Sequence, residues 1–170
     1  ELSTKDPIKD RKTEVLGRIS FLAGNKNFTL TAVADRIDIM ENGNLLIIDY
    51  KTGTIPSGKE VEAGFSPQLP LEAVIASNGG FSNIKQSNSI RLEYWRVRGG
   101  NNPGEVVRPS ENIVKLQEDA LKGLKHLVEI YQDQETPYPS RPNPSYAPQY
   151  SDYEHLARVR EWSTFAKRSK

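Results

Sequence analysis

The segment LLIIDYKTG, residues 45–53, restricts the fold more than any other part of the chain. Four consecutive apolar residues lead into an aspartate, a tyrosine and a lysine, and a glycine then ends the run. A strand that is apolar on both faces is buried on both, so residues 45–52 are expected to form a central strand of a sheet. Because side chains alternate along a strand, Asp49 and Lys51 must project from the same face. This pair is either a structural ion pair at a strand end or part of a catalytic site.

The remaining hydrophobic pattern predicts an α/β (α+β) domain with the element order β-β-β-α-β-α. Strands are expected at residues 14–22, 28–40 and 89–97, and helices at residues 67–77, from 110 to about 134, and near 153–162. A proline-rich segment, TPYPSRPNPSYAPQY, precedes the last helix and is expected to be extended. The length suits one domain, and residues 1–170 are predicted to form a single domain.

Composition and charge exclude several classes of protein. The formal net charge is only +1, which is not the strongly basic balance that indicates nucleic-acid binding on its own. The chain contains no cysteine, which excludes disulfides and thiolate metal sites and fits a reducing, cytoplasmic compartment. No apolar run reaches the roughly 18–20 residues needed to span a membrane, and no membrane partner is expected. The chain begins with Glu1 and not with methionine, which suggests that it is part of a longer protein.

Residues 53–59, GTIPSGK, match the GxxxxGK pattern of a phosphate-binding loop that follows a strand. The pattern requires a serine or threonine hydroxyl for Mg²⁺ at the next position, which here is Glu60. A carboxylate there would repel the phosphates, and Pro56 lacks the backbone N–H that such a loop uses. The sequence therefore disfavours nucleotide binding at this loop.

A metal-dependent hydrolase would need a further carboxylate near Asp49, and the preceding strand offers Asp35 and Asp38 in the segment TAVADRID. The register of the hairpin decides between them. A two-residue Asn-Gly turn would place Arg36 and Asp38 on the face of the acid–base pair. One extra residue in the turn would instead place Asp35 opposite Lys51 and diagonal to Asp49. The residues alone leave both registers open.

Two carboxylates on adjacent strands, together with the Tyr50 carbonyl, would form a hard oxygen site suited to Mg²⁺ or Mn²⁺. Such an ion polarises a scissile phosphate and activates a bound water. Lys51, on the same face, could orient that water and stabilise the charge that develops on the phosphoryl group. Two acids and a lysine in this arrangement therefore predict phosphodiester hydrolysis.

The spacing of Asp35 and the triplet DYK at residues 49–51 resembles the D…(D/E)xK signature of the PD-(D/E)xK nuclease superfamily. The ending DYKTG and the downstream Gln68 are similar to its RecB-like branch. The segments ADRID, ENGN, VEAGFSPQLPLEA, TPYPS and DYEHLARVREWS resemble the C-terminal nuclease domain of AddB subunits of alphaproteobacterial AddAB helicase–nucleases. This resemblance extends from about residue 14 to residue 163, which is nearly the whole chain.

The resemblance implies a restriction-endonuclease-like PD-(D/E)xK core, in which helices flank a central mixed β-sheet. Asp35 and Asp49 fall on the family's two metal ligands. Lys51 falls on the catalytic lysine, and Gln68 falls on the glutamine of a QxxxY helix that helps to hold the lysine and the phosphate. The resemblance therefore implies a Mg²⁺- or Mn²⁺-dependent deoxyribonuclease.

Nuclease domains of this kind act as exonucleases on single-stranded DNA while a helicase motor resects double-strand breaks for recombinational repair. The implied partners are therefore single-stranded DNA ends and an AddA-type helicase–nuclease subunit. The alternative interpretation is a module that retains the nuclease fold for DNA binding or assembly and does not cut.

Three features depart from the family. Glu72 stands where the QxxxY helix has its tyrosine. Many AddB domains bind an iron–sulfur cluster, and none is expected in a chain without cysteine. An upstream helix of the family carries a metal-site histidine, whereas His126 and His155 lie far downstream, so that element is expected to precede this chain. Asp38 is assigned to a structural pair with Arg36, since the resemblance favours the other aspartate of the strand.

Overall fold

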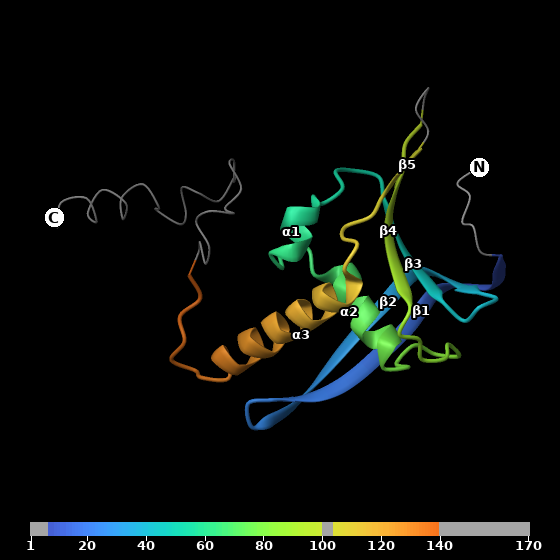
Figure 1. Ribbon diagram of the computed structural model, residues 1–170. Helices are drawn as coiled ribbons and strands as arrows, with labels where there is room; N and C mark the ends of the chain where they lie inside the picture. Colours follow the sequence, from blue (N-terminus) through green and yellow to red (C-terminus); the bar gives the residue numbers. More distant parts are fainter. Residues whose placement is uncertain (1–6, 100–103, 140–170) are drawn as a thin grey trace, which may run out of the picture. The chain divides into compact units, whose positions relative to one another are not determined.

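The computed structural model describes residues 7–99 and 104–139, and Figure 1 shows how their helices and strands are arranged. The strands are β1 (Ile8–Ala23), β2 (Lys26–Met40), β3 (Leu45–Lys51), β4 (Ile90–Val97) and β5 (Gly104–Val107). The helices are α1 (Gly58–Glu62), α2 (Gln68–Ser77) and α3 (Ile113–Ile130). All of these elements belong to a compact unit that ends at Gln132, and a second unit begins at Asp133. The helix predicted near 153–162 lies outside the described residues, as does most of the proline-rich segment.

The strands form one mixed sheet in the order β1-β2-β3-β4-β5. β3 and β4 are parallel, and the other neighbouring strands are antiparallel. Parallel strands cannot be joined by a tight turn, so the chain crosses from β3 to β4 through α1 and α2. Figure 1 shows the three helices on one side of the sheet. The predicted α/β fold, with a central mixed sheet and flanking helices, is confirmed.

β3 lies in the middle of the sheet, as its apolar run predicts. Its four apolar residues, 45–48, are at most 1% exposed. Leu45 and Ile47 contribute to the core on the helix side. The other two pack on the opposite face with Met40 and Trp95. Burial of each large aliphatic side chain contributes about 1.5–3 kcal/mol, so these residues fix the strand that carries the charged pair at its end.

α2 is apolar on nearly every side, and seven of its ten residues are buried. It contacts three strands of the sheet as well as α3. In the amphipathic α3, by contrast, Leu116 is the one fully buried residue. α2 is therefore the helix that packs directly against the carboxyl end of β3. No helix among the described residues is long and apolar enough to cross a membrane.

Two short elements, α1 and β5, are absent from the sequence-based prediction. α1 begins after Ser57, whose hydroxyl accepts a hydrogen bond from the Glu60 N–H. The Glu60 carboxylate accepts one in return from the Ser57 N–H at 2.7 Å, which completes a capping box. Glu60 therefore caps a helix that begins at the end of the segment that matches GxxxxGK.

β5 has four residues and pairs with the end of β4. β1 begins at Ile8, earlier than predicted, because a polar segment also pairs with β2.

The turn between β2 and β3 contains three residues, 41–43. The Met40 N–H donates to the Asn44 carbonyl at 2.9 Å, so these two residues close the turn. Gly43 has a φ of +83°, a conformation that favours glycine. The extra residue of the turn is therefore Glu41, on the β2 side.

This turn makes both registers considered from the sequence wrong. Backbone pairing of β2 with β3 continues to Arg36 and Ile48. Continued by one step beyond the last paired residues, this register places Asp35 opposite Asp49, and not opposite Lys51 as the longer turn was expected to do. The face is nevertheless the one that a hydrolase site needs, because directly opposed residues of an antiparallel pair share a face.

Candidate active site

Asp35 lies at a break in the pairing of β1 with β2. The ladder pairs the residues on either side of Asp35 and omits both Asp35 and its neighbour across the strands, Glu14. Glu14 has a φ of 50°, which a residue with a side chain rarely adopts. The Asp35 carboxylate accepts a hydrogen bond from the Tyr50 N–H at 2.9 Å. At this point the Asp35 side chain takes the place of a backbone hydrogen bond and joins β2 to the end of β3.

Asp49 and Lys51 occupy the end of β3 on the helix side of the sheet. The Lys51 ammonium lies 3.0 Å from Asp49 Oδ1 and 2.8 Å from Asp49 Oδ2. The Asp49 side chain is 3% exposed and that of Lys51 is 30% exposed, so a buried carboxylate holds an ammonium that reaches solvent. Tyr94, the neighbour of Asp49 on β4, is buried beside them, and its ring centre is 5.9 Å from the ammonium.

α2 adds Gln68 from its first turn. Gln68 Oε1 lies 3.5 Å from the Lys51 ammonium. The other end of this amide, Nε2, donates to Glu72 Oε1 at 3.2 Å, one helical turn further along. The contacts therefore form a continuous chain from the Asp49 carboxylate through the lysine and the glutamine to the Glu72 carboxylate.

Burial is the main influence on the acidic groups of this site. It raises the pKa of Asp49, and the charge of Asp35 adds to the rise, while Lys51 opposes it. Burial also raises the pKa of Glu72 to about 7, with smaller contributions from the charges of Asp49 and Asp35. The pKa of the Tyr94 hydroxyl is raised by burial as well. Burial disfavours the negative charge of Asp49 and Glu72, and a cation bound nearby would compensate that charge.

The oxygen atoms of the site fit a hard divalent cation. Asp35 and Asp49 supply carboxylates from adjacent strands. The N–H and C=O of one strand residue point to the same neighbouring strand, so Tyr50 also directs its carbonyl toward the Asp35 side. Asp49 Oδ2 is buried, and the Lys51 ammonium lies 2.8 Å from it. Within residues 7–99 and 104–139, no three His, Cys, Asp or Glu side chains could hold an ion, so the carbonyl and water would complete its coordination.

Asp38 projects from the opposite face of the sheet, where it pairs with arginine as expected. Arg36 Nε donates to its carboxylate at 2.9 Å, and Arg11 Nε donates at 2.8 Å. Arg36 also donates to the Tyr50 hydroxyl at 3.0 Å and lies 4.9 Å from the centre of the Trp95 ring. These contacts assign Asp38 to the structure of the sheet and separate it from the two aspartates on the helix side.

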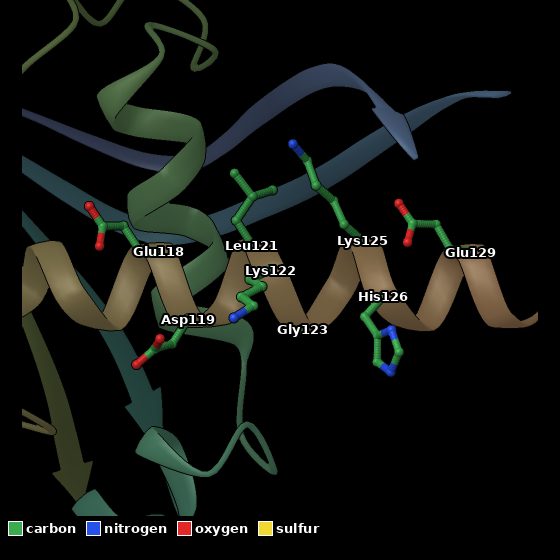
Figure 2. A pocket seen from close by; sticks show the side chains of 8 residues that line it. All are labelled: Glu118, Asp119, Leu121, Lys122, Gly123, Lys125, His126 and Glu129. Atoms are coloured by element: carbon green, nitrogen blue, oxygen red, sulfur yellow. The ribbon is translucent and has the colours of Figure 1, made fainter. Parts of the chain in front are cut away.

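A hollow of about 820 Å³ lies along α3, and all of the residues that line it belong to that helix. Figure 2 shows His126 on the side of the helix that also carries Asp119 and Lys122. None of the lining residues is one of the acids or the lysine at the end of β3. His126 is exposed, and its position matches the expectation that it does not belong to the metal site.

Two residues of the cluster, Glu72 and Tyr94, received no catalytic role from the sequence. Glu72 was visible only as a departure from the family pattern. The position of Tyr94 depends on the parallel register of β3 and β4, which puts it beside Asp49. A sequence shows such a register only when the pairing of the two strands is already known.

Comparison with known proteins assigns the family. The sequence profile of the PD-(D/E)XK nuclease superfamily matches residues 3–151. The match covers most of the chain and includes the strands that carry Asp35 and Asp49. The chain belongs to the PD-(D/E)XK nuclease superfamily. Its members are nucleases that generally use Mg²⁺ or Mn²⁺.

Similar proteins occur in Rickettsia. An uncharacterized protein of Rickettsia felis is 37% identical over 90 residues, which is 53% of this chain and 10% of that protein. An uncharacterized protein of Rickettsia typhi is 31% identical over 115 residues, which is 65% of this chain and 13% of that protein. The chain thus spans about a tenth of the length of the curated relatives it matches. The crystal structure of SSO0001 aligns with a TM-score of 0.40 and 20% identity, covering 66% of this chain and 50% of that one.

Proposed function

We propose that this chain is the metal-dependent exonuclease domain of an AddAB-type helicase–nuclease and cuts single-stranded DNA during double-strand break resection. The observation that carries the proposal is the buried Asp49 carboxylate with the Lys51 ammonium at 2.8 Å and Asp35 on the adjacent strand. Membership of the nuclease superfamily supports the class of reaction. The segments that resemble AddB, from ADRID to DYEHLARVREWS, support the finer assignment.

Each residue of the site has a distinct task in this proposal. Asp35, Asp49 and the Tyr50 carbonyl would hold Mg²⁺ or Mn²⁺, which supplies a Lewis acid for the phosphate and its attacking water. Lys51 reaches solvent from beside Asp49, so its ammonium can donate to a phosphate oxygen and stabilise the charge of the transition state. Gln68 would steady that ammonium through its side-chain carbonyl.

The proposed partners are single-stranded DNA ends and an AddA-type subunit. The matched relatives are far longer than this chain, which is the arrangement expected if the nuclease domain forms part of a large motor subunit. The formal net charge of +1 offers little general attraction for phosphate. The isolated chain is therefore expected to cut slowly, since no motor delivers DNA to it.

Cleavage of end-labelled DNA in Mn²⁺ tests the proposal. The 170-residue chain is expected to degrade linear single-stranded DNA and to leave circular single-stranded DNA intact, because an exonuclease needs an end. Lys51→Ala should lower kcat by on the order of 10²-fold, as loss of one transition-state donor does. Lys115→Ala is the matched control, since Lys115 lies exposed on α3 in a pair with Asp119.

Three outcomes would contradict the proposal in different ways. Cutting of circular DNA would identify an endonuclease. Equal rates for Lys51→Ala and wild type would remove the lysine from the chemistry. DNA binding without cleavage, together with Mn²⁺ binding that is unchanged in Asp49→Asn by calorimetry, would favour the non-cleaving DNA-binding or assembly module.

A further inference from the structure

Glu72 is a buried carboxylate that the packing of α2 does not require. It is 1% exposed, and its buried neighbours on α2 are apolar. A leucine or methionine would fill such a position without the cost of burying an uncompensated charge. Oε2 of Glu72 makes no hydrogen bond, so the one bond through Oε1 must account for the residue.

That one bond goes to Gln68 and fixes the direction of its amide. A glutamine amide has a donor end and an acceptor end. In the structure Nε2 faces Glu72 at 3.2 Å, and Oε1 faces the Lys51 ammonium at 3.5 Å. The reversed amide would point its N–H groups at the ammonium and its carbonyl at the carboxylate, and both contacts would be repulsive. The two charged neighbours therefore select one orientation.

We propose that Glu72 is a positioning residue for the catalytic lysine: its carboxylate holds the Gln68 amide with the carbonyl turned to Lys51, and so sets the ammonium beside Asp49. This inference rests on the proposed nuclease function, in which Lys51 acts on the phosphate. Neither carboxylate oxygen of Glu72 forms a hydrogen bond with the lysine or with either aspartate, and its effect passes through the glutamine.

Glu72 does not join the two aspartates in a three-carboxylate site. In the described part of the chain, no set of three His, Cys, Asp or Glu side chains is arranged to share an ion. The positioning role also holds in both protonation states of the carboxyl. Burial raises the pKa of Glu72 to about 7, and the neutral acid retains a carbonyl oxygen that can accept the Gln68 N–H. In that state the Lys51 ammonium still repels the reversed amide.

A double-mutant cycle on kcat tests the inference. Glu72→Leu removes the acceptor and should lower kcat about 3- to 10-fold, the loss expected for one hydrogen bond. Gln68→Ala should cause a similar loss, and the double variant should be no slower than Gln68→Ala alone. Glu72→Gln keeps a carbonyl and the same shape, so it should stay within about 2-fold of wild type. Glu93→Leu is the matched control, a buried carboxylate on the opposite face that contacts Trp95 and Arg108.

The Gln68 side-chain amide gives a second readout that does not depend on cleavage. Its NH₂ resonances are assigned by their loss in Gln68→Ala, and they should shift in Glu72→Gln and keep their position in a Glu93→Gln control. Losses in kcat that multiply in the double variant, or amide resonances that ignore position 72, would overturn the inference. If wild type does not cleave DNA at all, the proposed function fails, and the amide resonances still decide whether Glu72 orients Gln68.

Discussion

Replacing Glu72 by a neutral side chain should stabilise the metal-free protein at pH values at which the carboxyl would otherwise be ionised, and should have little effect at acidic pH. The ordinary pKa of this carboxyl is 4.5, and burial raises it to about 7. Each pKa unit corresponds to about 1.4 kcal/mol, so ionised Glu72 costs the folded state about 3 kcal/mol. Exposure of 1% leaves little solvent to screen this cost. Glu72→Gln removes the ionisation and keeps the shape of the side chain.

The sign of the effect follows from proton binding in the two states. Between pH 4.5 and about 7 the folded protein holds the Glu72 proton that the unfolded chain has released, so the contribution of this group to stability falls as pH rises. Below this range both states are protonated, and above it both are ionised. The gain from Glu72→Gln should therefore be small near the lower limit and reach its full size above the upper one.

Urea unfolding at a series of pH values, in the presence of a chelator, measures the gain. The difference in unfolding free energy between Glu72→Gln and wild type should grow by about 3 kcal/mol from about pH 4.5 to pH 8. Ser77→Ala on the same helix removes a hydroxyl that donates to the Val74 carbonyl and accepts from the Asn78 side-chain amide, and it removes no titrating group, so its difference should be flat. A flat difference for Glu72→Gln as well would refute the assignment of a desolvated, easily protonated carboxyl at this position.

Two further predictions concern stability. Asp38→Ala leaves the Arg36 guanidinium buried without its carboxylate and should cost about 3–5 kcal/mol in urea unfolding. Asp10→Ala breaks the exposed pair with Lys12 and should have a far smaller effect. Equal costs would show that the buried pair is not a structural unit. Asn112→Ala removes the side chain that accepts the Lys115 N–H at the start of α3 and should cost about 1 kcal/mol, while Asn112→Asp should keep most of the cap; identical stability of Asn112→Ala and wild type would contradict this.

The sequence was sufficient for the central strand and for the pairing of its charges. Residues 45–48 are apolar on both faces, and a strand with this pattern must be covered on both sides. The alternation of side chains then brings Asp49 and Lys51 together without further information. Both inferences use only local chain geometry, and local geometry is what a sequence encodes most directly.

The relation between β2 and β3 required the structure. The glycine of the turn was evident, but the position of the extra residue was not, because Glu41 and Asn44 can each extend an Asn-Gly turn. α1 could have been predicted, since Ser57 and Glu60 have the spacing of a capping box. The burial of Glu72 could not have been, because it depends on where α2 meets the sheet.

The three-residue turn 41–43 also limits how the length of this chain can change. One inserted or deleted residue there would shift β2 by one position against β3, turn Asp35 to the opposite face and bring Arg36 beside Asp49. A change of two residues would restore the face. Insertions and deletions in this turn are therefore expected to change its length by an even number of residues, or to be accompanied by a compensating bulge. The length of an exposed loop is thus restricted by the need to keep the two aspartates on one face of the sheet.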